Sequence, residues 1–414
     1  MTQPIRILRV IGRYAPAWQY GGSVRYSHDL DAALARQGFS LTVYTSDQID
    51  GSRRAPLRRE TLGAVDVHRF PTPWNYAADR AQWLAMYPLG LRQALHERVT
   101  EFDLLHVTEG RAAHVRWAFD AARRAGVPIV WSPLGALADG VGLRRPYRRL
   151  YDRLHRTRRL MSEARIVIAQ SPHEASVVER LGAWPSRIRI IGLGVDERAF
   201  QTLPPRGALR DGLGIGRSQP MILFLGRFHP AKGLDVLLRS VAIARRRYPD
   251  LQLVLIGWDD GALRTVERVA RALDLGNALR ILPPAFDRAR LQAYVDADAF
   301  AASLTIYEET SLAAMEALAC GTPCVLSRQC EIPGLEATGG GRVANCDPEA
   351  FAAALVAVLS DPARVAHAAA ARRWILAAHA IDRVASAHAV AFREAVGAAG
   401  DWPAGVAAGR ASSW

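Results

Sequence analysis

Lysine is almost absent from this chain. Of its 53 lysine and arginine residues only Lys232 is a lysine, so arginine serves wherever a generic positive charge is enough. A lone lysine is expected where a compact, rotatable ammonium group is needed and a planar guanidinium does not fit. The alternative is one ordinary surface lysine left by chance.

Other features that the sequence lacks narrow the class of protein further. It has no run of about 18 apolar residues, so we expect no transmembrane helix. The segment 1–13 has only a short apolar stretch, broken by Arg6 and Arg9, which predicts a first strand and not a signal peptide. The few cysteines form no C-x-x-C pair and have no histidine cluster near them. We therefore expect reduced, mostly buried thiols in a cytoplasmic protein, without a metal site, at Cys320, Cys324, Cys330 and Cys346.

The net charge is the first feature that is present in excess. At +13, with a pI of about 10.2, the chain should attract something anionic: nucleic acid, an anionic membrane surface or phosphorylated substrates. No aromatic–basic stacking motif supports nucleic acid as the partner. The charge is concentrated in one segment, 144–159, which contains eight arginines opposed only by Asp152.

Strand-like apolar runs alternate with helical patterns along the whole chain. At 414 residues we expect two domains, each a doubly wound parallel sheet covered by helices, with a ligand cleft between them. The Pro- and Gly-rich stretch 201–220 is predicted as the linker. The expected organisation is a first domain over 1–200, the linker, a second domain over 221–378, a helix over 379–396 that could cross back to the first domain, and a tail over 397–414.

A glycine-rich turn that contains the lone lysine lies between a predicted strand and a predicted helix. Met221–Leu225 reads as a buried strand, Gly226-Arg-Phe-His-Pro-Ala-Lys-Gly233 follows, and a helical pattern begins at Leu234. Turns of this kind bind phosphate through exposed helix N–H groups and the helix dipole. Arg227 and Lys232 add two positive charges there, which favours a phosphate ligand.

Two glutamates, Glu308 and Glu316, are separated by seven residues. The first lies in a loop after a predicted strand, and the second about two turns inside the following helix, on the face that points back toward that loop. Together they could hold two hydroxyl-bearing parts of one ligand, with N–H groups near Thr310 and Ser311 free for a phosphate. Alternatively, Glu308 only favours the helix dipole and Glu316 is solvated.

The first half contributes a similar pattern. A strand, Ile7–Ile11, is followed by Tyr20-Gly21-Gly22-Ser23 and a helix. Paired glycines just before a helix let a phosphate approach the backbone closely. An ordinary loop would look the same.

In their order and spacing these motifs resemble the retaining glycosyltransferases of family 4, also called glycosyltransferase group 1, over nearly the whole chain. The resemblance rests on Y-G-G-S-V, G-R-F-H-P-A-K-G, G-W-D-D-G-A-L, the E-x7-E segment and C-E-I-P-G-L. It implies the GT-B fold: two Rossmann-like domains that face a cleft. It also implies that Arg227 and Lys232 neutralise a donor diphosphate, that Glu308 holds sugar hydroxyls and that Glu316 holds the nucleotide ribose. The donor-binding residues would be Gly21, Gly22, Thr310, Ser311, Leu312 and Glu316.

The first domain departs from the family pattern in three places. Many relatives have P-H-G after the fifth strand, whereas this chain has Leu134 between Pro133 and Gly135. The N-G-V-D of relatives is Leu193-Gly-Val-Asp196 here. The D-L-x-H-x-H pattern keeps His106 but has Thr108 in place of its second histidine. The donor side is thus expected to be intact and the acceptor side altered.

Two further segments have alternative interpretations. Asp259 and Asp260 could bind a metal ion, but we favour a loop role because the resemblance implies that Arg and Lys replace a metal. The Arg-rich segment is predicted as one helix over 147–162. It could be an interfacial helix attracted to anionic lipid, or a domain helix with its apolar stripe in the core and a solvated basic face.

The sequence thus predicts a retaining hexosyltransferase that moves a sugar from a nucleotide diphosphate donor to a hydroxyl of a glycan, lipid-linked or small-molecule acceptor. No cofactor or metal is expected. The predicted location is cytoplasmic, with a peripheral position at the inner face of the membrane if the Arg-rich helix binds lipid. Alternatives are a GT-B epimerase or sugar-phosphate synthase, and a non-enzymatic basic binding protein.

Overall fold

The computed structural model describes residues 3–73, 87–138, 144–306, 310–330 and 332–397. By its internal contacts the chain divides into two units, each described here by itself. The first unit comprises the residues up to Ala17, Asp31–Ile191 and the residues from Ala385 onward. The second comprises Trp18–Leu30 and Gly192–Val384.

The first unit is built on an eight-stranded sheet in the order β3-β4-β2-β1-β5-β6-β7-β8. All neighbouring pairs are parallel except the β3–β4 pair. The central strands are buried on both faces, as strands covered by helices on both sides must be. Most of their side chains are apolar, and the buried Arg9 is an exception that forms an ion pair with Asp31. The strands are β1 (Arg6–Val10), β2 (Ser40–Ser46), β3 (Arg59–Leu62), β4 (Val65–Phe70), β5 (Leu104–Thr108), β6 (Ile129–Ser132), β7 (Ile166–Ala169) and β8 (Ile188–Ile190).

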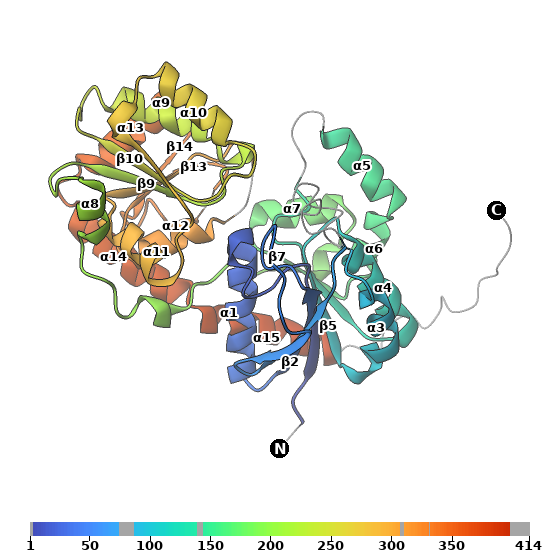
Figure 1. The fold of residues 1–414 in the computed structure, drawn as a ribbon. Coiled ribbons are helices and arrows are strands. Elements are labelled where there is room, and N and C mark those ends of the chain that lie inside the picture. Colours follow the sequence, from blue (N-terminus) through green and yellow to red (C-terminus); the bar gives the residue numbers. More distant parts are fainter. Residues whose placement is uncertain (1–2, 74–86, 139–143, 307–309, 331, 398–414) are drawn as a thin grey trace. The chain divides into compact units, whose positions relative to one another are not determined.

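Helices flank this sheet in the arrangement seen in Figure 1. One of them, α7, begins with a strong local signal, because the Ser171 side chain accepts a hydrogen bond from the Glu174 N–H and proline follows at the first helical position. The helices along this part of the chain are α1 (Gly22–Arg36), α3 (Leu91–Arg98), α4 (Ala113–Ala125), α5 (Arg144–Leu154), α6 (Thr157–Glu163) and α7 (Pro172–Arg180).

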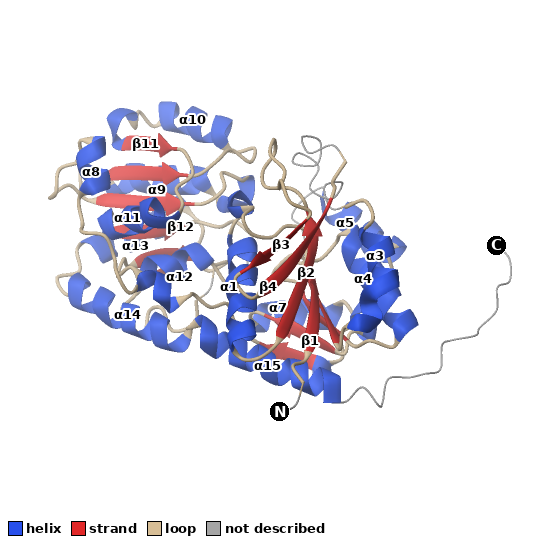
Figure 2. Cartoon of the chain, turned by 60° about the horizontal axis from the view of Figure 1, so that its bottom comes forward, coloured by secondary structure: helices blue, strands red, loops and turns tan. Residues whose placement is uncertain are grey.

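The second unit has a six-stranded parallel sheet in the order β11-β10-β9-β12-β13-β14, drawn in red between blue helices in Figure 2. Its central strand, β9, is entirely apolar in sequence (MILFL). The strands are β9 (Met221–Leu225), β10 (Gln252–Ile256), β11 (Leu279–Leu282), β12 (Ala299–Ala302), β13 (Cys324–Ser327) and β14 (Gly341–Ala344).

The helices of the second unit bury apolar stripes against this sheet. Phe351 and Leu355 of α13, for example, are fully buried in the same cluster as Leu237 and Leu238 of α9. The helices are α8 (Ala208–Leu213), α9 (Leu234–Ala244), α10 (Leu263–Ala272), α11 (Asp287–Asp296), α12 (Leu312–Ala319), α13 (Pro348–Leu359) and α14 (Arg364–Ala378), and α15 (Ile381–Gly397) runs on into the first unit.

Each sheet has one topological switch point, where successive connections leave toward opposite edges. It lies between β1 and β5 in the first unit and between β9 and β12 in the second. In open parallel sheets, ligands bind outside the carboxyl ends of the strands at this point. Each unit therefore offers one position for a ligand.

The structure differs from three sequence-based expectations. The single helix predicted over 147–162 is wrong: Arg156 adopts a left-handed conformation (φ +53°) that separates α5 from α6. The segment 201–220, predicted as a linker, contains α8, whose Arg210 is buried and donates to Asp296 O (2.7 Å) and Asp298 Oδ2 (2.5 Å). Strand β3 was not expected, because its alternating burial gives no apolar run.

None of the described helices is by itself long and apolar enough to cross a membrane. Helices α13 and α14 reach such a composition only when taken together, and they are bent by 101° at the break between them.

Candidate functional site

The turn that carries the lone lysine lies at the switch point of the second unit. It is fixed to the end of β12, because Ser303 Oγ donates to Gly233 O (2.8 Å) and to Lys232 O (3.3 Å). A Cβ at Gly233 would lie 2.0 Å from Ser303 O, and its φ is +59°, so only glycine permits this close approach. The short 3-10 turn Pro230–Lys232 thus has a fixed position at the carboxyl edge of the sheet.

The two cations predicted for this turn are both partly buried. Arg227 Nη1 lies 2.6 Å from Asp260 Oδ2 in an ion pair. Asp259 instead accepts hydrogen bonds from the N–H groups of Gly261 (2.9 Å) and Leu263 (3.0 Å), at the start of α10. Both aspartates therefore have partners within this loop. Within the described ranges, no three His, Cys, Asp or Glu residues gather as metal ligands would.

The start of α12 brings four of the predicted donor-binding residues together. Ser311 is the N-cap of this helix, and its Oγ accepts from the Ala314 N–H at 3.3 Å. Thr310 and Leu312 are buried beside it. Within the same unit, a Cβ on Gly22 would lie 3.2 Å from the Leu312 Cβ, so Gly22 lies directly against this helix start. Gly21 has φ +95°, a conformation that favours glycine.

Glu316 is buried, and its carboxylate is already paired. Arg290 of α11 forms an ion pair with Oε1, and the Tyr294 hydroxyl donates to Oε2 at 3.1 Å. Burial and the Glu316 charge raise the pKa of Tyr294 well above its usual value. Although burial opposes the charge of Arg290, Glu316 holds the pKa of that guanidinium above its usual value. The solvated role considered for Glu316 is therefore excluded.

Sequence reasoning missed Arg290 and Tyr294. The available signal was their spacing of four residues on a predicted helix, which places both on one face. Arg25 lies in the same unit, and its guanidinium carbon is 4.2 Å from the centroid of the Trp18 ring. Burial and the charge of Arg290 lower the pKa of Arg25, while Glu316 opposes that shift.

The other glutamate of the pair, Glu308, was predicted as catalytic together with Arg227 and Lys232, and it lies outside the described residues, in the segment 307–309. The geometry of the E-x7-E pair is therefore described only at Glu316.

In the first unit, Leu134, which departs from the family pattern, lies at the carboxyl edge of the sheet, and His106, which keeps that pattern, lies in the core. Leu134, after β6, has φ +51°, and the N–H of Gly135 donates to Glu174 Oε1 at 2.6 Å. His106 is buried, its Nε2 lies 2.8 Å from Ser132 Oγ, and burial lowers its pKa well below the usual range. His106 is thus a neutral core residue.

The Leu193–Asp196 segment has a structural role in the second unit. Val195 forms a β-bridge with Ala380, and Leu193 O lies 3.2 Å from His379 Nδ1. A Cβ on Gly194 would lie 3.1 Å from His379 O. Close packing against the start of α15 thus accounts for the glycine.

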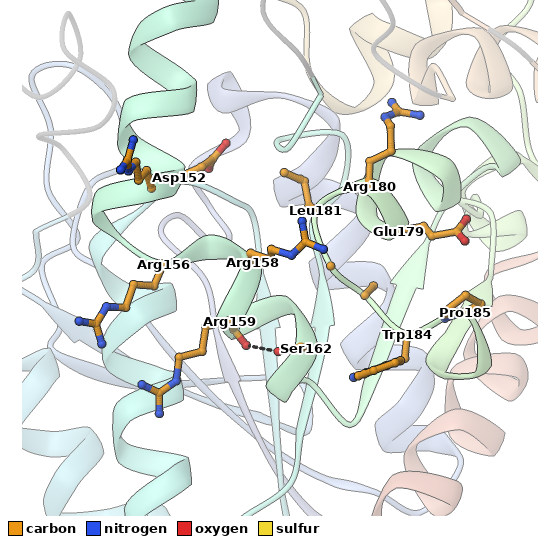
Figure 3. A pocket seen from close by; sticks show the side chains of 13 residues that line it. Asp152, Arg156, Arg158, Arg159, Ser162, Glu179, Arg180, Leu181, Trp184 and Pro185 are labelled. Carbon is orange, nitrogen blue, oxygen red and sulfur yellow. Dashed lines mark hydrogen bonds between the residues drawn. The ribbon is translucent and has the colours of Figure 1, made fainter.

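The Arg-rich segment lines an open groove of about 910 Å³ between α5, α6 and the end of α7 (Figure 3). Arg158 extends toward Leu181, and Trp184 forms part of the wall. Helix α5 exposes large apolar side chains, with Tyr147 75%, Leu150 54% and Leu154 66% exposed. A core position for the whole apolar stripe is therefore wrong for α5, although Leu160 and Met161 of α6 are buried.

The four cysteines are free thiols, and all but Cys346 are buried. Burial raises the pKa of Cys320 to about 12 and that of Cys324 well above its usual value. Neither thiol is a nucleophile at neutral pH, because the thiolate is the reactive form.

Comparison with known proteins assigns both units to described families. The family model "Glycosyl transferase 4-like domain" matches residues 21–194, and "Glycosyl transferases group 1" matches residues 219–361. D-inositol 3-phosphate glycosyltransferase 2 of Catenulispora acidiphila is 32% identical over 369 residues, which cover 84% of this chain and 83% of the relative. The D-inositol 3-phosphate glycosyltransferase of Kineococcus radiotolerans is 29% identical, and the match covers 83% of each chain.

Solved structures share the fold at lower identity. Sucrose-phosphate synthase from Thermosynechococcus elongatus superposes with a TM-score of 0.71 at 20% identity, over 95% of this chain and 100% of that one. Anabaena Alr3699/HepE, solved in complex with UDP-glucose, gives a TM-score of 0.71 at 18% identity, over 93% of this chain and 98% of that one.

Proposed function

Since the chain belongs to the group 1 glycosyltransferases of family 4 and has the GT-B fold, we propose that it is a retaining hexosyltransferase. In this proposal a nucleotide diphosphate sugar is the donor, and a hydroxyl of a glycan, lipid-linked or small-molecule acceptor receives the sugar. The observation that carries it is the fixed, cationic turn of Arg227 and Lys232 at the switch point of a unit that also holds Glu316.

The donor diphosphate would lie at this turn. Arg227 and Lys232, with N–H groups at the start of α12, would stabilise the negative charge that develops as the bond from the anomeric carbon to the diphosphate breaks. Cations already held in place act strongly on such a leaving group, and losing one typically costs a factor of about 10²–10³ in rate. These groups would thereby do the work that a metal ion does elsewhere.

The two glutamates would divide the rest of the donor between them. Glu308 would hold hydroxyls of the transferred sugar, and Glu316, oriented by Arg290 and Tyr294, would hold the ribose. The acceptor oxygen would attack from the face that the diphosphate leaves, through an oxocarbenium-like state, and its proton would pass to the departing phosphate. The configuration of the sugar would then be retained.

The named relatives suggest which acceptors to try first. Two of them are D-inositol 3-phosphate glycosyltransferases, so myo-inositol and D-inositol 3-phosphate are the first small-molecule candidates.

We also propose that α5 and the groove beside it hold the protein at an anionic membrane surface on the cytoplasmic side. Three features support this: the exposed apolar residues Tyr147, Leu150 and Leu154, the exposed Trp184 and the arginines around the groove. Basic amphipathic helices bind anionic lipid through buried apolar area and electrostatic attraction together.

A screen of nucleotide sugars for thermal stabilisation tests the donor site, since a ligand that binds only the native state raises the unfolding temperature. Lys232→Ala should lose the stabilisation, whereas Arg247→Ala, an exposed site with the same change of charge, should keep it. Nuclear magnetic resonance of the product then gives its anomeric configuration. An inverted product would contradict retention, and no stabilisation by any nucleotide sugar would contradict the proposed donor class.

A further inference from the structure

Glu109 stands out among the side chains that the proposed function has not used. It directly follows β5, one of the two strands at the switch point of the first unit, and Gly12 lies beyond the end of the other, β1. The N–H of Gly12 donates to Glu109 Oε2 at 3.3 Å. The carboxylate therefore lies across the place where a parallel sheet binds ligands.

The backbone of Glu109 is strained and held in place. Its φ is +78°, a region that costs a non-glycine residue about 1–3 kcal/mol. The Glu109 N–H donates to Ser132 O (3.1 Å), and the indole of the buried Trp131 donates to Glu109 O (2.7 Å). Such strain persists where the surroundings enforce it, and it is concentrated at functional sites.

One oxygen of the carboxylate is held and the other is available. His114 Nε2 lies 3.5 Å from Oε2, on the same side as Gly12. Among the described residues, none hydrogen-bonds to Oε1, and the side chain is 17% exposed. The acid thus has one oxygen fixed by the protein and one that a ligand can reach.

The charged and titratable groups that the structure describes around Glu109 do not form a strong ion pair with its carboxylate. Burial lowers the pKa of His114 to about 4, so this imidazole is neutral at pH 7. Arg13, beyond β1, favours the ionised acid, but burial outweighs it and raises the pKa of Glu109 to about 7. The group therefore changes its charge near neutral pH.

We propose that Glu109 binds the acceptor, with Oε1 accepting a hydrogen bond from an acceptor hydroxyl, and that it discriminates against acceptors with a phosphate at that position. This inference rests on the proposed function. The second unit uses its own switch point for the donor, which leaves the β1–β5 switch point for the other substrate. A carboxylate accepts strongly from hydroxyls but repels a phosphate, so a neutral polyol or sugar fits here better than a phosphomonoester.

The test compares Glu109→Gln and Glu109→Gly with Glu97→Gln, an exposed change of the same charge in α3. Transfer is measured with myo-inositol, D-inositol 3-phosphate and p-nitrophenyl hexosides. Glu109→Gly should raise the acceptor KM by about 10- to 100-fold, the loss expected for one charged hydrogen bond. Glu109→Gln should fall between it and the wild type. It should also improve the phosphate acceptor relative to the neutral one.

Three readouts separate this role from a structural one. The wild-type acceptor KM should fall as pH rises from 6 to 8, because the ionised acid accepts better, and the Gln variant should show no such change. Hydrolysis of the nucleotide sugar by water, without acceptor, should be unchanged. Glu109→Gly should unfold at a temperature equal to or above that of the wild type, since glycine relieves the strain at φ +78°.

A lower unfolding temperature for Glu109→Gly than for the wild type would make Glu109 a structural residue and overturn the inference. This measurement needs no acceptor, so it decides the matter even if the enzyme transfers sugar to none of the acceptors tested. Unchanged acceptor KM values in both variants would overturn it as well. If the wild type neither binds nor hydrolyses any nucleotide sugar, the proposed function fails and the inference fails with it.

Discussion

Replacing Glu316 should have two effects that the structure allows to be separated. Glu316→Ala removes the proposed ribose contact and also leaves the guanidinium of Arg290, 9% exposed, without its carboxylate. Breaking a buried ion pair in this way costs about 3–5 kcal/mol. For a domain of this size each kcal/mol lowers the unfolding temperature by about 2–4 °C, so the second unit should unfold about 6–20 °C lower.

The double variant Arg290→Met with Glu316→Met separates the two effects. Replacing a whole buried pair by apolar residues of similar volume is often neutral or stabilising. The double variant should therefore regain most of the lost unfolding temperature. It should not regain donor binding, because the carboxylate that would hold the ribose is still missing.

Calorimetry gives the unfolding temperature, and initial rates against donor concentration give KM and kcat. The expected pattern is a raised donor KM in both variants with kcat little changed, since a ribose contact stabilises ground and transition states alike. If the double variant binds donor as the wild type does, Glu316 serves only to hold Arg290, and the assigned role is wrong.

Four further outcomes are expected. Lys232→Arg should reduce the rate about 10²–10³-fold, because a planar guanidinium does not replace a point charge at a crowded diphosphate; full activity would undercut the argument from the lone lysine. EDTA should leave the rate unchanged, because Asp259 and Asp260 are engaged by the backbone and by an arginine. If EDTA abolishes the rate and Mg²⁺ or Mn²⁺ restores it, the two aspartates would again be candidate metal ligands. Arg210→Ala should lower stability to urea by about 1.5–3 kcal/mol, since it removes a buried guanidinium from Asp298 and leaves that carboxylate paired, among the residues described, with Arg206 and Arg364; a stability loss below about 1 kcal/mol would contradict this. Sedimentation with anionic vesicles should occur at low salt and weaken as salt rises. Replacing Arg153, Arg156, Arg158 and Arg159 by glutamine should weaken the free energy of vesicle binding by ~1 kcal/mol per residue. If the wild type does not sediment with such vesicles, the membrane proposal is wrong.

The sequence predicted the strand-helix alternation well because the strands that position the sites are continuous apolar runs. Met221–Leu225 is an example and is buried nearly throughout. Leu104–Thr108 is buried as well, although it includes His106 and Thr108. It failed where conformation depends on a single residue or on distant partners. Nothing in the local pattern shows that Arg156 becomes left-handed, or that Arg210 finds two aspartates nearly 90 residues away.

The candidate sites were predictable to the extent that their residues lie in recognisable turns. Lys232 and Arg227 could be found because a strand, a glycine-rich turn and a helix follow one another. Arg290 could not be paired with Glu316, since the contact joins two helices that local spacing does not relate. Glu109 was missed because its distinction is a backbone angle and a neighbour after another strand, Gly12.

The division of the chain also has a consequence for its biosynthesis. The first unit contains the residues from Ala385 onward, and in it the Phe392 ring lies 5.0 Å from the His106 ring and 6.3 Å from the Phe39 ring. Because synthesis proceeds from the N-terminus, the core around the first strands therefore cannot close before α15 has been made. A polypeptide released before residue 385 lacks Phe392 and leaves Phe39 and His106 uncovered. Such a truncated product should be bound by chaperones and degraded by proteases.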